Sequence, residues 1–390
     1  MPLDTPPPNP VLSASHPAAE DGTGAADAMA AWQGDAFPLI RDARGAHLTD
    51  GSGQRLLDLD NADGAVLLGH GDPAVARSIA RAAAQGIAGL PSVLAAELAA
   101  RLSPALPSGF QTLFLPRADA ALAAAIAVAR AATGRRAVIA AGVGFDAAPV
   151  EGPLRRAAPG DVAALEAALL ADGGGVAAIL ADPAGDPGSP GDWPRVVQAA
   201  ARRHGALVIF DERRSFLRLG LGGATLGCGI APDLLCHGQD LANGLPMAAL
   251  SGDPGLLGRV ANHAPVPGLE GHAAAAAHTV LDRLAVTAVP AALAQAGAAL
   301  RDGFEMALAA AGLHGAYRLD GPATCMTLHA VAGRPALRRL AAALAGQGVF
   351  LRARINLSLA FGTMEVLEAT TAFARALRQL RRTEERGLPG

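Results

Sequence analysis

Between residues 112 and 251, short apolar segments of strand length alternate with longer segments that favour helices. Strands are expected over residues 112–115, 137–140, 177–181, 207–210, 233–237 and 246–251, and helices over residues 119–133 and 193–204. This alternation is typical of a mostly parallel sheet with helices on its faces, so we predict a doubly wound α/β fold. Sites in such sheets lie outside the carboxyl ends of the strands, where Asp211 follows an apolar strand.

The segments on either side differ from this pattern. Residues 1–32 are rich in Pro, Ala, Gly and Asp without an apolar period, which predicts a disordered N-terminal lead. Residues 33–72 contain two short strands around a glycine turn, and an amphipathic helix is expected over residues 73–86. After residue 284, long Ala/Leu helices lie between short strands. We therefore predict a large domain over residues 73–283 and a smaller α+β domain formed by residues 33–72 and 284–390.

Composition and charge exclude several classes of protein. Half of the chain is apolar, the net charge is only -3, and there is no dense basic stripe, which argues against nucleic acid as a partner. The longest apolar stretch, residues 120–129, is too short to span a bilayer. The three cysteines have no metal-binding spacing. These features predict a cytoplasmic protein without a metal site or a membrane partner.

The chain contains no lysine. Lys and Arg together number 32, and every one of these residues is Arg. A guanidinium group stays protonated and does not form imines with aldehydes, whereas a lysine amine does. The side chains of this protein therefore cannot carry out chemistry that requires a nucleophilic amine.

Three segments in the same order carry a resemblance to a known family. They read RDARGAHLTDGSGQRLLDLDNADGAVLLGHGDPAV, then GALVIFDE, then GGATLGCGIAPDLLCHGQDLANGLPMAALSG. From about Phe37 to Arg378 the chain resembles the class III aminotransferases, and among them the glutamate-1-semialdehyde aminomutase branch. The resemblance implies fold type I of the pyridoxal-phosphate (PLP) enzymes, with an active site shared across a homodimer. It also implies that Asp211 pairs with the protonated pyridine nitrogen of the cofactor.

The resemblance also locates the position at which the family carries its catalytic lysine. That lysine lies in a PDLxxxGKxxxxGxP context, which here is residues 232–246 with Gln239 at the lysine position. A glutamine amide is neither nucleophilic nor basic, so it can neither form a Schiff base nor carry the α-proton.

Other cofactor contacts of the family are also altered. Its phosphate-binding Ser-Gly-Thr is replaced by residues 116–119, where Asp119 is expected as the N-cap of the next helix and Arg117 is the remaining anion-binding candidate. A threonine donated by the family's partner subunit aligns with Gly268. The aromatic-His pair that stacks on the ring aligns with Phe145 and Asp146. Arg213 also aligns with the residue that packs under the ring, where its positive charge would repel a protonated pyridine. Together these changes predict that no cofactor is bound, and the alternative is that PLP or pyridoxamine phosphate (PMP) binds.

Two functional hypotheses follow, and the sequence leaves open whether the protein is an enzyme. The first is a protein without transaminase activity. In one version it is a cofactor-independent enzyme of a specialised pathway, with Asp211 or Glu212 as base beside Gln239 and with Arg213 and Arg214 binding a small acidic substrate. In the other version it is a catalytically silent subunit. Such a subunit would form a mixed dimer with an active paralogue in place of a homodimer.

The alternative is an aminotransferase or aminomutase-type enzyme that binds PMP or PLP and works without an internal aldimine. A conventional transaminase requires a lysine that this chain does not contain.

Overall fold

The computed structural model describes residues 38–86, 92–142, 145, 152–171, 175–184, 191–261 and 271–385. Its centre is a seven-stranded sheet in the order β4-β10-β9-β8-β7-β5-β6. The strands are β4 (Gln111–Leu115), β5 (Ala137–Ala140), β6 (Leu154–Arg156), β7 (Val176–Ala181), β8 (Leu207–Glu212), β9 (Leu234–His237) and β10 (Ala248–Gly252). Only β10 runs antiparallel to its neighbours, so the prediction of a mostly parallel doubly wound sheet is confirmed.

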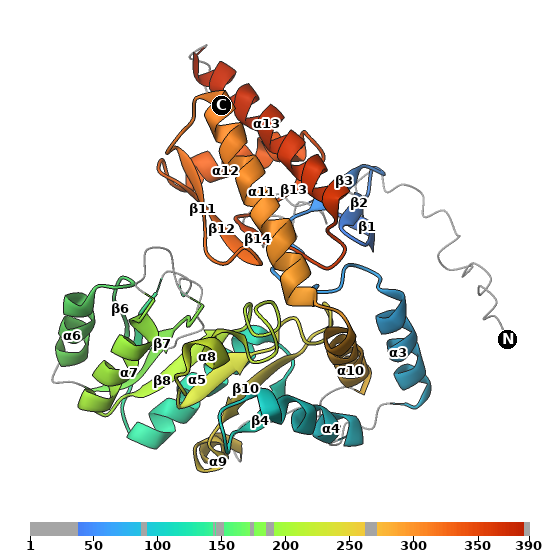
Figure 1. Cartoon of the computed structure of the whole chain (residues 1–390). Helices are drawn as coiled ribbons and strands as arrows, with labels where there is room; N and C mark the ends of the chain where they lie inside the picture. Colours follow the sequence, from blue (N-terminus) through green and yellow to red (C-terminus); the bar gives the residue numbers. More distant parts are fainter. Residues whose placement is uncertain are drawn as a thin grey trace, which may run out of the picture.

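Helices cover both faces of this sheet, as Figure 1 shows. They are α5 (Ala118–Thr133), α6 (Val162–Leu170), α7 (Trp193–His204), α8 (Gly223–Cys228) and α9 (Pro254–Ala261). Successive side chains of a strand point to opposite faces, and β8 shows this: Val208 and Phe210 pack in one buried cluster with α7, while Ile209 packs in another with α5. Burial on both faces explains why these strands read as continuous apolar runs.

Helices α3 (Pro73–Ala84), α4 (Val93–Leu102) and α10 (Gly271–Val286), with the short 3-10 helix η1 (Ser103–Ala105), lie beside the large sheet. Helix α3 begins after Asp72, whose carboxylate accepts hydrogen bonds from the amides of Ala74 and Val75 and so caps the helix. The helix ends two residues earlier than expected, at Ala84. Helix α10 packs against α3 and α4.

Two small sheets and three helices make up the upper part of the molecule in Figure 1. One sheet has the order β1-β2-β3-β13 and the other β11-β12-β14. The strands are β1 (Ile40–Arg44), β2 (His47–Asp50), β3 (Arg55–Asp58), β11 (Tyr317–Asp320), β12 (Cys325–Ala330), β13 (Val349–Phe350) and β14 (Arg354–Asn356). The helices are α11 (Val289–Ala311), α12 (Arg334–Ala345) and α13 (Thr363–Glu385).

The parallel pairing of β3 with β13 joins the N-terminal strands to the C-terminal part of the chain. This pairing supports our proposal that residues 33–72 and 284–390 form one smaller domain. The predicted disordered lead, residues 1–32, lies outside the described residues. Within the described part of the chain, no single helix has the length and apolar character needed to cross a membrane. Helices α10 and α11, which are bent by 78° relative to each other, reach that length and apolar character only when they are taken together.

Candidate active site

One edge of the large sheet gathers the polar residues that follow its strands. Because β10 is antiparallel to both β4 and β9, the strands β4, β9, β8 and β7 end at the same edge. Asp211 lies near the end of β8, Asp182 follows β7, and Gln239 follows β9 after the left-handed Gly238. The N-terminus of α5 follows β4. This edge is therefore the candidate active site.

Asp211 is ionised and held by a neighbouring guanidinium group. Arg213 donates from Nε and Nη2 to the two carboxylate oxygens, each at 2.6 Å. The side chain of Asp211 is 11% exposed. Burial alone raises the pKa of this carboxyl group, but the charge and hydrogen bonds of Arg213 outweigh burial and leave the pKa below its usual value. The strand end thus carries a fixed negative charge that is already engaged in a bidentate ion pair.

Glu212, the other predicted base, lies on the opposite face of β8. It is fully buried and accepts hydrogen bonds from the amides of Ala224 and Thr225, each at 2.6 Å. Gly223, with φ +56°, leaves room for this contact, since a Cβ there would lie 1.9 Å from Glu212 Oε2. Burial raises the pKa of Glu212. The structure therefore engages Glu212 at the start of α8 and does not bring it together with Asp211.

Two arginines face the candidate site from different parts of the chain. Arg214 Nη2 lies 3.8 Å from Asp182 Oδ2, and Arg354 Nη1 lies 3.4 Å from Asp63 Oδ1. Burial first, and then the positive charge of Arg214, lower the pKa of Arg354. Like charges held near each other in a partly buried site favour an anion between them.

Sequence reasoning identified Arg214 but missed Asp63, Asp182 and Arg354. A signal for Asp182 was present, because it follows a predicted strand as Asp211 does. No local signal pointed to Asp63 or Arg354, which reach the site only through tertiary packing.

Gln239 contacts an unusual turn. Its amide Nε2 donates to the backbone oxygen of Asp63 at 2.9 Å. Residues 61–63 have φ values of 47°, 55° and 54°, so three non-glycine residues in a row are left-handed before Gly64. This conformation costs an L-residue roughly 1–2 kcal/mol, and such strain concentrates at functional sites. The amide of Gln239 therefore helps to hold a strained turn at the edge of the site.

The start of α5 differs from the prediction. The N-cap is Arg117, not Asp119, because the chain is extended at Arg117 and already helical at Asp119, the second residue of the helix. Arg117 donates from Nε and Nη2 to the Asp119 carboxylate, both at 3.0 Å, and its side chain is 74% exposed. The side chain of Arg117 makes no capping hydrogen bond to the amides of the first helical turn.

The predicted ring-stacking residue lies in the core. Phe145 is 2% exposed and belongs to the buried cluster between α5 and the sheet. Asp146 and Gly268, which align with other cofactor contacts of the family, lie outside the described residues.

A buried polar layer lies next to the site. Asp240 is fully buried, neither of its carboxylate oxygens has a hydrogen-bond partner among the described residues, and burial raises its pKa to about 7. His237 bonds to Ser251 at 2.8 Å and its ring lies 4.1 Å from that of Phe216. Burial lowers the pKa of His237 to about 3, so it is neutral at physiological pH. Within the described ranges, no group of three or more His, Cys, Asp or Glu residues could hold a metal ion.

The fold and this site define a class of protein. The FumI protein of Sphingopyxis sp. MTA144, solved in its PLP internal aldimine form, is 25% identical, with a TM-score of 0.78 over 89% of this chain and 90% of that chain. A lysine-to-alanine variant of a Pseudomonas aeruginosa PAO1 glutamate-1-semialdehyde aminomutase, in complex with PMP, is 22% identical, with a TM-score of 0.75 over 89% and 88%. The chain has the fold of the PLP-dependent transaminases, fold type I.

The family model "Aminotransferase class-III" matches residues 154–358. The glutamate-1-semialdehyde 2,1-aminomutase of Roseiflexus castenholzii is 35% identical over 314 residues, which are 71% of this chain and 72% of that protein. The chain belongs to the class III aminotransferase family.

These findings correct the prediction that no cofactor is bound. Membership of this family, together with the PLP and PMP forms of the similar structures, points to PLP or PMP binding. The altered side chains were a poor guide to cofactor binding because the fold still places a carboxylate and a helix N-terminus at one edge of the sheet, independently of the side chains lost around them.

The donors present fit a phosphorylated pyridine in two respects. Asp211 is an ionised carboxylate at a strand end, suited to a protonated ring nitrogen once Arg213 turns away. At the start of the 16-residue α5 the N-cap side chain makes no hydrogen bond to the helix amides, although Asp119 Oδ1 accepts from the amide of Ala120 at 3.0 Å. Arg117 balances the charge of Asp119, so an incoming phosphate meets a neutral pair. A side-chain amine is absent, because the chain has no lysine.

Proposed function

We propose that this chain is an aminotransferase or aminomutase-type enzyme that holds PMP or PLP without a covalent link to the protein. The observation that carries this proposal is the complete absence of lysine from a chain of the class III aminotransferase family. Gln239 stands at the lysine position. Its place after β9, beside the strand that carries Asp211, supports this assignment.

The non-covalent mode has support among the similar proteins. The lysine-to-alanine variant of the Pseudomonas aeruginosa enzyme was solved in complex with PMP. PMP already carries the amino group, so it needs no lysine for attachment. The cofactor, when bound, supplies this amine and a ring that accepts electrons.

The residues of the chain then have distinct tasks. Asp211 would keep the proton on the ring nitrogen, and the pyridinium charge would take over from Arg213 in holding the pKa of this buried carboxyl group low. The amides at the start of α5, with Arg117, would hold the phosphate. For this to occur, Arg213 must exchange its ion pair with Asp211 for the cofactor, while Arg117 keeps its ion pair with Asp119 and leaves the start of α5 without a net negative charge.

The substrate side of the site favours an anion. Arg214 and Arg354 are close enough for the charge of Arg214 to lower the pKa of Arg354, and both side chains are partly buried. A carboxylate bound between them would relieve this repulsion. We therefore propose a small acidic amino compound or its carbonyl counterpart as substrate. Gln239, held to the Asp63 carbonyl, would position the turn beside it.

The proposal is tested by cofactor binding and borohydride reduction. The purified protein, incubated with PMP or PLP and then desalted, should retain cofactor that is released on denaturation. Borohydride treatment should leave no pyridoxyl group on any peptide in a digest. A PLP group covalently trapped on the unmodified chain would contradict non-covalent binding, and a chain that retains neither cofactor would contradict the function.

A lysine placed at position 239 tests the assignment of Gln239. After incubation with PLP, Gln239→Lys should form a link that borohydride traps on the peptide carrying residue 239. Gln379→Lys, on the exposed face of α13, is the matched control and should not be labelled above background. Equal labelling of the two variants would show that residue 239 does not face the cofactor.

A further inference from the structure

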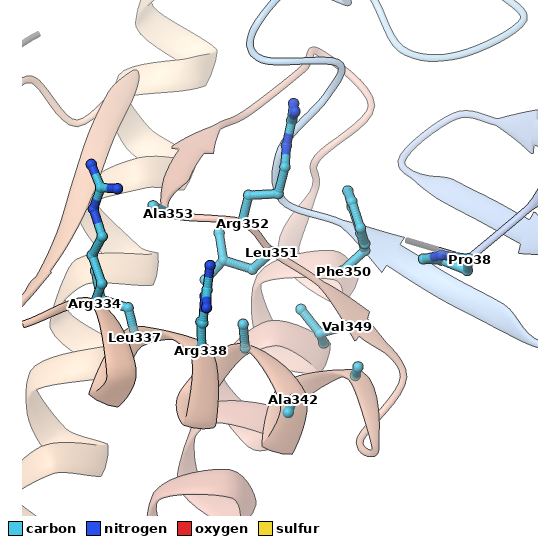
Figure 2. A pocket seen from close by; sticks show the side chains of 12 residues that line it. Pro38, Arg334, Leu337, Arg338, Ala342, Val349, Phe350, Leu351, Arg352 and Ala353 are labelled. Carbon is cyan, nitrogen blue, oxygen red and sulfur yellow. The ribbon is translucent and has the colours of Figure 1, made fainter. Parts of the chain in front are cut away.

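A cavity of about 580 Å³ lies on the smaller domain and is lined by none of the residues assigned to the candidate active site. It lies between α12 and residues 349–353, with Pro38 at its rim, as Figure 2 shows. The size is within the range of ligand-binding clefts. We call it the α12 groove.

The α12 groove combines an apolar floor with a basic rim. Its floor is lined by Leu337, Val349, Phe350 and small alanines of α12, which leave the space open. Arg334, Arg338 and Arg352 lie around it, and none of the twelve residues that line it is acidic. Arg352 Nε donates to Asp60 Oδ2 at 2.9 Å, and Arg334 and Arg338 are exposed on successive turns of one helix face. An occupant with acidic groups and large apolar side chains would match this surface.

The sequence immediately before Pro38 has these properties. Residues 1–37 contain five acidic residues and no arginine or lysine, and the stretch that directly precedes Pro38 in the sequence holds Trp32 and Phe37 with Asp27 and Asp35. Trp32 is six residues from Pro38, a reach of about 20 Å for an extended chain. The next described residues, Leu39 and Ile40, are apolar yet 54% and 44% exposed. These exposed apolar residues directly follow Pro38, which lines the groove, and so extend the apolar surface open to an occupant.

We propose that residues 27–37 of the same chain dock in the α12 groove. Trp32 or Phe37 fills the alanine-lined floor, and Asp27 and Asp35 pair with Arg334 and Arg338. The docked segment would tie the N-terminus to α12 and β13. This proposal is independent of the cofactor site, since it involves none of its residues.

Acrylamide quenching of Trp32 tests the proposal in the full chain. The chain has two tryptophans, and Trp193 is 1% exposed with its indole N–H bonded to the Ala141 oxygen, so it gives a nearly constant background. Trp32→Phe measures that background. In the unmodified protein, Trp32 should be shielded from acrylamide and should emit at shorter wavelength than free tryptophan.

Charge reversal on the groove should release the segment. Arg334→Glu with Arg338→Glu turns two attractions into repulsions and should lower the docking equilibrium about tenfold or more, so the quenching slope of Trp32 rises. Arg378→Glu with Arg382→Glu, at the same spacing on α13, carries an equal charge change and should leave the slope unchanged. Equal slopes in the unmodified and groove variants, at matched circular dichroism and Tm, would overturn the proposal. Shielding that disappears on dilution would overturn it too, by showing that the segment comes from a second copy.

Discussion

Asp240 provides the most discriminating test of the buried polar layer beside the site. It follows Gln239, is fully buried, and has no hydrogen-bond partner for either carboxylate oxygen among the described residues. Burial raises its pKa from 3.8 to about 7, although the charge of Arg218 opposes the rise. The carboxyl group should therefore be protonated in the folded protein at acidic pH, and its ionisation at higher pH should lower the stability of the folded state.

The sign and size of the effect follow from these values. Between about pH 4 and pH 7 the folded state binds this proton more tightly than the unfolded state, so stability falls as pH rises through this window. A shift of about three units, at 1.36 kcal/mol per unit, corresponds to about 4 kcal/mol lost above pH 7. An asparagine amide resembles the protonated acid and does not ionise. Asp240→Asn should therefore match the unmodified protein near pH 4 and exceed its stability by about 4 kcal/mol at pH 8.

Urea unfolding of the two proteins at pH 4 and pH 8 measures this difference. Other titrating groups affect both proteins equally, so the change in the difference between them isolates Asp240. If Asp240→Asn is instead less stable at pH 8 by about 3–5 kcal/mol, Asp240 is ionised against Arg218, and its removal leaves a buried cation without its counter-charge. The reasoning from burial would then be refuted.

Three further predictions concern the residues around the site. Ala62→Gly should raise the free energy of unfolding in urea by about 1 kcal/mol, because Ala62 is exposed and has a left-handed φ of 55° that glycine adopts without strain. The control Ala83→Gly, at an exposed helical position in α3, should lower it by a similar amount. The same effect in both variants would show that the backbone at Ala62 is not strained. Arg218→Met should cost about 3 kcal/mol or more, because the buried guanidinium donates to the carbonyls of Leu357, Gly64 and Val66, and a loss below about 1 kcal/mol would disprove this role. Succinate should raise the Tm of the unmodified protein but not of Arg354→Met, and an equal rise in both would exclude Arg354 from the anion site.

The sequence by itself determined the architecture and the main chemical constraint. Apolar runs such as residues 207–210 and 177–181 are buried on both faces of a parallel sheet, and this burial leaves a signal that is local to each strand. The same logic placed Asp211 at the edge where sites form. The absence of lysine needed no structure at all, because it depends only on which functional groups are encoded.

Only the tertiary structure decided what the polar residues do. Asp211 and Glu212 are adjacent in sequence, but one pairs with Arg213 at the site while the other binds the start of α8 on the opposite face. Asp63 and Arg354 are 291 residues apart and meet through the packing of the smaller domain, as do Gln239 and the Asp63 carbonyl. Hydrogen bonds and charges act over a few ångströms, so their partners depend on long-range packing, whereas apolar burial leaves a periodic record along the chain itself.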